Sequence, residues 1–398
     1  MAEPASVITR RHAAVRRLRH DPRAQPFIVI WEVTRACQLA CVHCRADAIR
    51  HRDPLELSTA EGKNLLTELA EFPRPHPLVV LTGGDPLERA DLTELVAYGT
   101  GLGLSVAFSP SVTPRLTRDA LVELRDAGIK AVSLSLDGAT ARSHDAFRQV
   151  PGVFDATQDA IATVRSLGLR LQLNTTVTAN NVAELPAILR LVLRAGAGLW
   201  SVFFLVPTGR GSGLRPLSAV EEEDVLHWLY DVSELVAVKA TEAPHYRRIA
   251  IQRAQQPKPP RGELGARLRA ATSDLLAGQV STRPRRPPID VNSGRGFAFV
   301  DHRGAVYPSG FLPVAVGSVR TAPFADIYRD APLLQALRDP DALGGKCGRC
   351  DFREVCGGSR SRAYAATGDP LAEDPSCAYQ PPGSVAGRLS PAGLIREP

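Results

Sequence analysis

The feature that most constrains the fold of this chain is a regular alternation of short apolar runs with longer amphipathic stretches. Each run is β-branched or aromatic in part and is bounded by turn residues, which is typical of a strand. The stretches between the runs have helical periodicity. Strands are therefore predicted at 27–33, 78–81, 104–108, 131–136, 169–177 and 199–206, and helices near 59–72, 89–101, 116–127, 153–167, 181–195 and 218–238.

Six β-α units in a row predict an α/β fold with a parallel sheet and helices on its outside. Six units are too few to close an eight-stranded barrel, so we expect a partial (β/α)6, TIM-like barrel. Such a fold leaves an open trough and places its site at the carboxyl ends of the strands. Ser58 and Glu61 form the capping box that begins the first predicted helix.

The other segments differ from this region in composition. The stretch 240–295 is rich in Pro and Arg and weakly periodic, which favours a linker or a mobile cover. A hairpin (296–300 and 305–307) and a helix (324–338) are predicted next. The predicted organisation is a basic lead-in at 1–26, the partial barrel at 27–239, the basic linker or cover at 240–295, a small cysteine-rich module at 296–380 and a disordered tail at 381–398.

Composition disfavours several classes of protein. Apolar residues make up 44% and charged residues 23% of the chain, which is the range of globular proteins. The longest apolar stretch, 198–206, is too short to span a bilayer, and the basic N-terminus has no apolar run behind its charges. We therefore expect a cytoplasmic protein without a membrane partner. Basic and aromatic residues do not interleave, which disfavours nucleic acid as a partner.

The cysteines form two groups along the chain. Seven is an odd number in a chain that looks intracellular, which argues against a framework of disulfides. Three thiolates in one group and four in the other leave none over. This division suits one site with an open coordination position and one closed site. The groups are Cys37, Cys41 and Cys44, and then Cys347, Cys350, Cys356 and Cys377.

The first group, Cys37-x3-Cys41-x2-Cys44, comes directly after the first predicted strand. Three thiolates on one short loop can hold three irons of a cubane and leave the fourth iron open. A zinc site or a set of buried unpaired thiols is the alternative interpretation of the same residues.

This segment resembles the signature of the radical SAM superfamily. The resemblance implies that Cys37, Cys41 and Cys44 hold a [4Fe–4S] cluster whose open iron binds S-adenosylmethionine. Cleavage of that molecule then gives a 5′-deoxyadenosyl radical, which takes a hydrogen atom from the substrate. His43 occupies the position where family members carry an aromatic residue beside the adenine, and a solvated loop histidine is the alternative interpretation.

The resemblance continues at the later strand ends. Gly83-Gly84-Asp85-Pro86 resembles the GGEP motif, which binds the ammonium of S-adenosylmethionine, with Asp85 in place of the usual Glu. Arg148 is similar to the arginine that pairs with the carboxylate of S-adenosylmethionine. Each residue alone is more easily explained as structural, but together they fit a cofactor trough. The other predicted contacts are Ser109, Ser133, Ser135, Asp137 and Asn174, and the loop Pro207–Gly211 is expected to flank the adenine.

The second cysteine group and its surroundings resemble the C-terminal extension of SPASM/twitch enzymes. This resemblance implies an auxiliary [4Fe–4S] cluster held by Cys347, Cys350, Cys356 and Cys377, which can relay electrons. A zinc ribbon is the alternative. Full SPASM members carry a further cysteine group in the hairpin, where this chain has Ser309, so one auxiliary cluster is expected.

Within the superfamily, residues from about 26 to 380 look closest to the haem and haem d1 maturases. This resemblance implies oxidative side-chain modification or decarboxylation of a tetrapyrrole, with a reductant such as flavodoxin or ferredoxin as partner. The stretch 247–296 holds eleven Lys or Arg and three acidic residues, a net +8 beside the +6 of the whole chain. That charge, with Arg360 and Arg362, would suit a polyanionic substrate; a solvated linker is the alternative.

Two other functions remain open at this point. The chain could be a maturase of a ribosomally synthesised peptide, since many such enzymes carry SPASM/twitch extensions. It could also be a non-catalytic iron–sulfur electron carrier, which the intact trio Cys37, Cys41 and Cys44 and the pair Gly83-Gly84 disfavour.

Overall fold

The computed structural model describes residues 14–257, 262–277 and 285–382. Its centre is one ten-stranded sheet in the order β10-β9-β8-β1-β2-β3-β4-β5-β6-β7. Strands β8 and β1 to β7 run parallel, and β9 and β10 add to β8 as antiparallel strands. The strands are β1 (Ile28–Glu32), β2 (Leu78–Thr82), β3 (Ser105–Phe108), β4 (Ala131–Ser135), β5 (Arg170–Val177), β6 (Leu199–Phe204), β7 (Val238–Thr241), β8 (Phe297–Val300), β9 (Ala305–Tyr307) and β10 (Gly317–Ser318).

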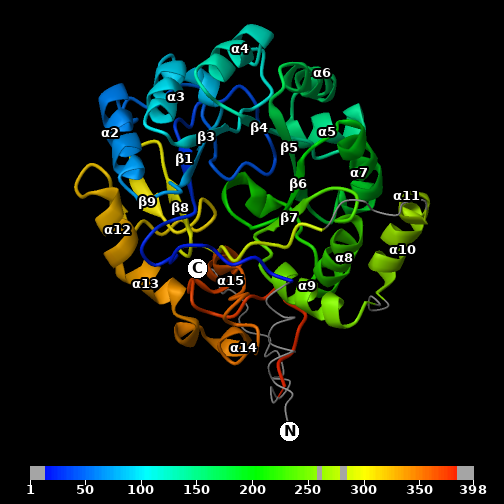
Figure 1. The fold of residues 1–398 in the computed structure, drawn as a ribbon. Coiled ribbons are helices and arrows are strands. Elements are labelled where there is room, and N and C mark those ends of the chain that lie inside the picture. The colour runs from blue at the N-terminus through cyan, green and yellow to red at the C-terminus, as the bar shows by residue number, and fades with distance from the viewer. Residues whose placement is uncertain (1–13, 258–261, 278–284, 383–398) are drawn as a thin grey trace, which may run out of the picture.

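Helices surround this sheet on the outside, as Figure 1 shows. The barrel helices are α2 (Thr59–Ala70), α3 (Leu92–Gly101), α4 (Arg118–Asp126), α5 (Ala141–Arg148), α6 (Val153–Ser166), α7 (Leu185–Arg194) and α8 (Ala219–Val232). The later helices are α9 (Tyr246–Gln255), α10 (Glu263–Ala271), α11 (Ser273–Ala277), α12 (Phe324–Asp330), α13 (Pro332–Arg338), α14 (Gly345–Gly348) and α15 (Arg360–Thr367). The capping box of Ser58 and Glu61 begins α2 as predicted.

The two faces of the sheet differ in polarity. In β5, Leu171 and Leu173 are fully buried on the helix side, whereas Gln172, Asn174 and Thr176 are half-buried on the other side. Trp200 of β6 packs edge-on against Trp228 of α8, with ring centroids 5.9 Å apart, so the helices cover its face of the sheet. The opposite face carries the half-buried polar side chains of β4 and β5, on the side of the sheet where the site is expected.

The predicted partial barrel is confirmed, and the structure extends it at both ends. β7 pairs with β6, where the prediction had continued a helix to residue 238, and β8 pairs in parallel with β1. The hairpin prediction is also confirmed, because β8 and β9 pair antiparallel. The predicted helix at 324–338 is instead broken in two, because Pro332 holds Ala331 in an extended conformation.

The stretch 240–295 contains three helices in its described part, where a weakly periodic linker or cover was expected. Helix α9 is buried on nearly every side, including its charged residues Arg247, Arg248 and Arg253. Buried arginines remove the polar stripe by which an amphipathic helix is identified in a sequence, so the pattern gave no helix signal. Residues 258–261 and 278–284 lie outside the described part of the chain.

Both ends of the chain are only partly described. Residues 1–13 of the predicted lead-in and 383–398 of the predicted tail lie outside the described residues. The backbone of Arg16 exchanges hydrogen bonds with Pro288 and Asp290, so the end of the lead-in lies against the segment before β8. In the described part of the chain, every helix is too short or too polar to cross a membrane.

Candidate functional site

The first cysteine group lies on the loop after β1, at the carboxyl end of the sheet. Cys37 and Cys41 are buried and Cys44 is half-buried. Each sulfur accepts a hydrogen bond, from the amide of Leu39 to Cys37 (3.4 Å), from the Arg148 guanidinium to Cys41 (3.6 Å) and from the amide of Ala48 to Cys44 (3.5 Å). N–H donors directed at sulfur stabilise thiolate ligands of a cluster. The residues therefore fit the iron–sulfur cluster that the sequence predicts.

The glycine pair after β2 contacts the backbone that leads into the cysteine loop. The amide of Gly84 donates to the Thr34 carbonyl (2.8 Å), and a Cβ at Gly83 or Gly84 would overlap the carbonyl oxygens of Thr34 or Ala36. The carbonyl of Gly84 accepts from the Ser111 hydroxyl (2.7 Å), which lies 3.5 Å from the Cys37 sulfur. Residues without a side chain are therefore required where this turn meets the backbone of Thr34 and Ala36, just before the cysteines.

The side chain of Asp85 points into the protein. Its carboxylate accepts from the Thr113 hydroxyl (2.6 Å) and from the amide of Leu87 (3.3 Å), and Pro86 begins the short 3-10 helix Pro86–Glu88. Burial raises the pKa of Asp85 to about 6. The carboxylate therefore fixes the turn itself, and the predicted contact of the turn with S-adenosylmethionine stays a prediction.

Arg148 and Asp137 form a buried ion pair beside the cysteine loop. Burial alone would raise the pKa of Asp137, but the Arg148 guanidinium holds it below its usual value. The second carboxylate oxygen of Asp137 accepts from the amide of Thr176 (2.7 Å). In the structure this guanidinium contacts Asp137 and the Cys41 sulfur, and its predicted pairing with a carboxylate of the cofactor stays a prediction.

His43 lies between these groups. Its ring packs on Phe147 with centroids 4.5 Å apart. Burial lowers the pKa of His43 to about 4, so the imidazole is neutral near pH 7. A neutral ring packed on an aromatic neighbour presents a flat surface beside the cysteine loop, which differs from the alternative of a solvated histidine.

The remaining predicted contacts share one wall of the trough. Ser133 and Ser135 are half-buried on the concave face of β4, and Asn174 pairs in register with Ser135 on β5. Phe108 pairs with Val132, so Ser109 and Ser133 follow at the same level. The structure therefore brings these four polar residues together at the carboxyl ends of three strands. Their contact with a cofactor remains a prediction.

Two residues of the loop after β6, Gly209 and Arg210, contact the backbone of the cysteine loop. The amide and the Nε of Arg210 donate to the carbonyls of Cys44 and Cys41, both at 3.0 Å. Gly209 has φ +52°, and a Cβ there would lie 2.5 Å from the Cys44 carbonyl oxygen. The Pro207–Gly211 loop supports the backbone of the cysteine loop, and its predicted place beside the adenine stays a prediction. Its strand-end position was visible in the sequence, but its distant partner was not.

The second cysteine group lines one small space. Cys347, Cys350, Cys356 and Cys377 surround a cavity of about 360 Å³, its opening to solvent included. Backbone amides donate to three of the sulfurs, those of Cys347, Cys350 and Cys356, at 3.3 to 3.5 Å. Burial raises the pKa of Cys356 to about 12, so a bound metal would be needed to displace its proton. Four free thiols around one space, three of them with amide donors, are the donor set that the predicted auxiliary cluster requires.

Arg360 and Arg362 were predicted to suit a polyanionic substrate, and this prediction is wrong. Arg360 is 1% exposed and donates to the carbonyls of Pro370 (3.0 Å) and Ala372 (2.7 Å) and to the Cys347 sulfur (3.6 Å). Arg362 is also buried and forms an ion pair with Glu222 of the barrel helix α8 at 2.6 Å. The Arg360 guanidinium is therefore engaged within the C-terminal module, and that of Arg362 joins the module to the barrel.

Part of the basic stretch 247–296 is also paired with acidic residues. The ion pairs join Arg248 to Glu223, Arg253 to Asp231, Arg285 to Glu234 and Arg295 to Asp290. Three of these acids lie on α8 or directly after it, outside the stretch over which the charge was counted. Its net charge therefore overstates the positive field, although Lys258, Arg261 and Arg283 lie outside the described residues.

Comparison with known proteins gives three findings. Residues 31–192 match the radical SAM superfamily. The AdoMet-dependent heme synthase of Oleidesulfovibrio alaskensis is 41% identical over 358 residues, which cover 89% of this chain and 87% of the relative. The mycofactocin maturase MftC of Mycobacterium tuberculosis is 31% identical over 382 residues, which cover 94% and 86%.

Among solved structures, Streptococcus suis SuiB bound to S-adenosylmethionine has a similar fold. The TM-score is 0.64 at 13% sequence identity, and the alignment covers 89% of this chain and 78% of SuiB. At this identity the likeness concerns the fold alone, and it supports the α/β partial barrel.

Proposed function

The chain belongs to the radical SAM superfamily, and we propose that this radical SAM enzyme oxidatively decarboxylates propionate side chains of an iron tetrapyrrole in haem formation. One observation carries the choice of substrate. Identity to the AdoMet-dependent heme synthase is 41%, against 31% to the mycofactocin maturase, over nearly the same residues.

The cofactors of the superfamily are a [4Fe–4S] cluster and S-adenosylmethionine, which together supply a 5′-deoxyadenosyl radical when bound. Cys37, Cys41 and Cys44 provide three thiolates for that cluster, and Arg148 offsets their negative charge at Cys41. The loop around them is held by Gly84 and Arg210, so that its sulfurs stay at the mouth of the trough.

The half-buried wall beside this loop suits a nucleoside. Ser133, Ser135 and Asn174 offer hydroxyl and amide groups in register, and His43 offers a neutral ring. In our proposal these groups bind the ribose and adenine of S-adenosylmethionine, and the Gly83–Gly84 turn lies at its amino acid end. Arg148 then acts as a positioning residue through Cys41 and Asp137, to which its two terminal nitrogens donate.

The proposed reaction converts a propionate side chain into a vinyl group. A propionate side chain loses one hydrogen atom, one electron and carbon dioxide, and a vinyl group remains. The hydrogen atom goes to the 5′-deoxyadenosyl radical, and an oxidised iron–sulfur cluster is the class of acceptor for the electron. We propose that Cys347, Cys350, Cys356 and Cys377 hold such an auxiliary [4Fe–4S] cluster, and that flavodoxin or ferredoxin reduces the first cluster.

Anaerobic turnover tests this proposal. The reconstituted protein is incubated with dithionite, S-adenosylmethionine and iron coproporphyrin III, and the products are analysed by mass spectrometry. We expect 5′-deoxyadenosine together with loss of carbon dioxide and two hydrogens from each converted side chain. Formation of 5′-deoxyadenosine with an unchanged tetrapyrrole would contradict the choice of substrate. Absence of 5′-deoxyadenosine under all conditions would indicate that the protein is a non-catalytic electron carrier.

A peptide substrate is the second candidate, and the 31% identity to mycofactocin maturase MftC supports it. The same incubation with a precursor peptide in place of the tetrapyrrole distinguishes the two. A cross-linked or decarboxylated peptide would favour the maturase.

A further inference from the structure

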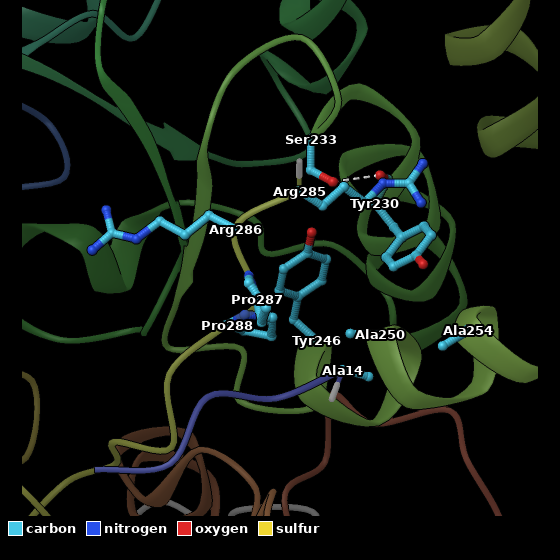
Figure 2. Close-up of a pocket in the computed structure, with 10 residues that line it drawn as sticks. All are labelled: Ala14, Tyr230, Ser233, Tyr246, Ala250, Ala254, Arg285, Arg286, Pro287 and Pro288. Atoms are coloured by element: carbon cyan, nitrogen blue, oxygen red, sulfur yellow. Dashed lines mark hydrogen bonds between the residues drawn. The ribbon is translucent and has the colours of Figure 1, made fainter. Parts of the chain in front are cut away.

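Helix α9 borders two spaces in the structure. Tyr246, Ala250 and Ala254 recur at every fourth residue and line the cavity that Figure 2 shows, together with Tyr230 of α8. Arg248 lies on another side of the same helix and lines the space that the second cysteine group surrounds. Helix α9 therefore brings an arginine from outside the C-terminal module to the predicted auxiliary cluster.

The lining of this cysteine space is basic. Its charged side chains are those of Arg248, Lys346 and Arg353, and none of the described residues that line it is acidic. The Lys346 ammonium donates to the Cys377 carbonyl (2.6 Å), and Arg353 forms an ion pair with Asp341 at 3.3 Å. Lys346 and Arg353 are half-buried, whereas Arg248 is only 2% exposed. Arg248 is thus the buried cation of the site.

The terminal nitrogens of Arg248 are held on the barrel side. Its Nη1 donates to one carboxylate oxygen of Glu223 (2.8 Å) and to the Gln252 side-chain oxygen (2.7 Å), and its Nη2 donates to the other oxygen of Glu223. The guanidinium carbon also lies 5.0 Å from the centroid of the Tyr379 ring. These contacts fix the guanidinium in place beside the cysteines.

One donor of Arg248 is not used by these contacts. Its Nε is buried and has no hydrogen-bond partner among the described residues. Of the described side chains that line the cysteine space, Arg248 alone has a buried nitrogen or oxygen without a partner. A buried N–H group without an acceptor costs free energy, and the sulfur atoms of a bound cluster are acceptors of the kind that this position lacks.

Helix α9 is attached to the module on both sides of Arg248 along the chain. The Nη2 of Arg247 donates to the Cys356 carbonyl at 3.1 Å. Ile251 packs with Phe352 in a small apolar cluster that Cys356 also contacts. The backbone, as well as the ion pair, therefore keeps Arg248 next to the cysteines.

We propose that Arg248 donates a hydrogen bond through Nε to a sulfur atom of the auxiliary cluster and thereby raises the reduction potential of that cluster. The presence of the cluster rests on the proposed function. Hydrogen bonds to sulfur stabilise the reduced form, which carries one more electron. A higher potential makes the cluster a better acceptor for the electron that the substrate loses.

A redox titration of the reconstituted full-length protein, followed by electron paramagnetic resonance, tests this bond. The signal of the auxiliary cluster is identified as the one that S-adenosylmethionine leaves unchanged. We expect Arg248→Gln to shift the midpoint potential of this signal to lower values and to leave that of the first cluster unchanged. Iron content and circular dichroism verify that each variant is loaded and folded. An unchanged potential of the auxiliary cluster would overturn the inference and leave the proposed function intact.

Arg253→Gln is the matched control. Arg253 lies on the same helix, is 7% exposed and forms an ion pair with Asp231 of α8 at 2.6 Å. Its guanidinium lies 4.8 Å from the centroid of Tyr230, beside the cavity in Figure 2, and it does not line the cysteine space. This variant should leave both potentials unchanged. Equal shifts in the two variants would show that a loosened α9 is the cause, which would also overturn the inference.

Pulsed electron paramagnetic resonance detects the bond directly, even where Arg248→Gln loses the cluster. The reduced protein carries arginine labelled with ¹⁵N at Nε. We expect a ¹⁵N coupling on the auxiliary signal that Arg248→Lys abolishes, because this variant keeps a cation opposite Glu223 without the labelled nitrogen. No coupling in the wild type, or a coupling that persists in Arg248→Lys, would overturn the inference. Zinc at the second cysteine group would instead refute the auxiliary cluster of the proposed function, and the inference with it.

Discussion

The two cysteine groups have similar ligands but different surroundings. In each, one arginine donates to a sulfur at 3.6 Å, Arg148 to Cys41 and Arg360 to Cys347. Arg148 also forms an ion pair with Asp137, next to the half-buried polar residues of β4 and β5. Arg360 instead donates its other hydrogen bonds to backbone carbonyls of the C-terminal module. The loops and strands around the thiols, together with the number of thiols, therefore decide which site can receive a ligand.

The largest expected effect comes from removing the ligands of one group. We expect wild-type protein to bind about eight irons and the variant with Cys37, Cys41 and Cys44 replaced by Ala to bind about four, with all cleavage of S-adenosylmethionine lost. Iron analysis and chromatography of 5′-deoxyadenosine measure both. A zinc content near one with about four irons in the wild type would show instead that the C-terminal site is a ribbon.

The buried ion pair beside the first group gives the next effect. Arg148→Gln leaves the Asp137 carboxylate buried without its cation, which should lower the free energy of unfolding by about 3–5 kcal/mol. Chemical denaturation measures it. The double variant with Asp137→Asn should lose less than the sum of the two single variants. Additive losses would show that the two side chains do not depend on each other.

The glycine pair tests how closely the cysteine loop is held. Gly84→Ala forces the turn away from the Ala36 carbonyl and should cost about 1–3 kcal/mol and loosen the first cluster. Gly101→Ala is the matched control, since nothing lies within 4 Å of an added Cβ there and alanine favours helix α3. Iron retention and thermal unfolding of the two variants are compared. Equal iron retention and equal thermal stability of the two variants would contradict the close contact between Gly84 and the Ala36 carbonyl.

The smallest effect is a pH dependence on the β8 side of the barrel. Burial alone would lower the pKa of His302, but hydrogen bonding to Glu32 and Asp53 raises it above 6.5. A raised folded-state pKa stabilises the protein at low pH, and the contribution is lost as the pH rises above 6.5. The unfolding free energy of wild type should therefore fall more between neutral and alkaline pH than that of His302→Gln. If the unfolding free energies of the two proteins changed with pH in parallel, His302 would make no such contribution to stability.

The sequence predicted the parts of the molecule whose signals are local. Strands β1 to β6 were predicted because each apolar run is bounded by turn residues, and both cysteine groups are visible in their spacing. Helix α9 was not, because Arg247 and Arg248 are buried by partners far along the chain. For the same reason Arg360 and Arg362 were assigned to a substrate when they in fact serve buried acids and carbonyls.

In the candidate site, too, features with a local sequence signal could be predicted, and those that depend on distant contacts could not. Residue types at the strand ends, such as Ser133 and Asn174, could be predicted from the alternation of the strand and the resemblance to a family. The supports of the cysteine loop could not, because Ser111 and Arg210 reach it only through the tertiary fold. Strand β7 was not predicted, because the predicted helix continued to residue 238 and the predicted linker or cover began at residue 240.

The difference between the two groups is tested most directly by electron paramagnetic resonance of the anaerobically reduced protein, recorded with and without S-adenosylmethionine. An open iron at Cys37, Cys41 and Cys44 and a closed cluster at the other four cysteines predict that the signal of one cluster changes and the other does not. A spectrum that stays the same for both clusters would contradict the open iron, and changes in both would contradict the closed second site.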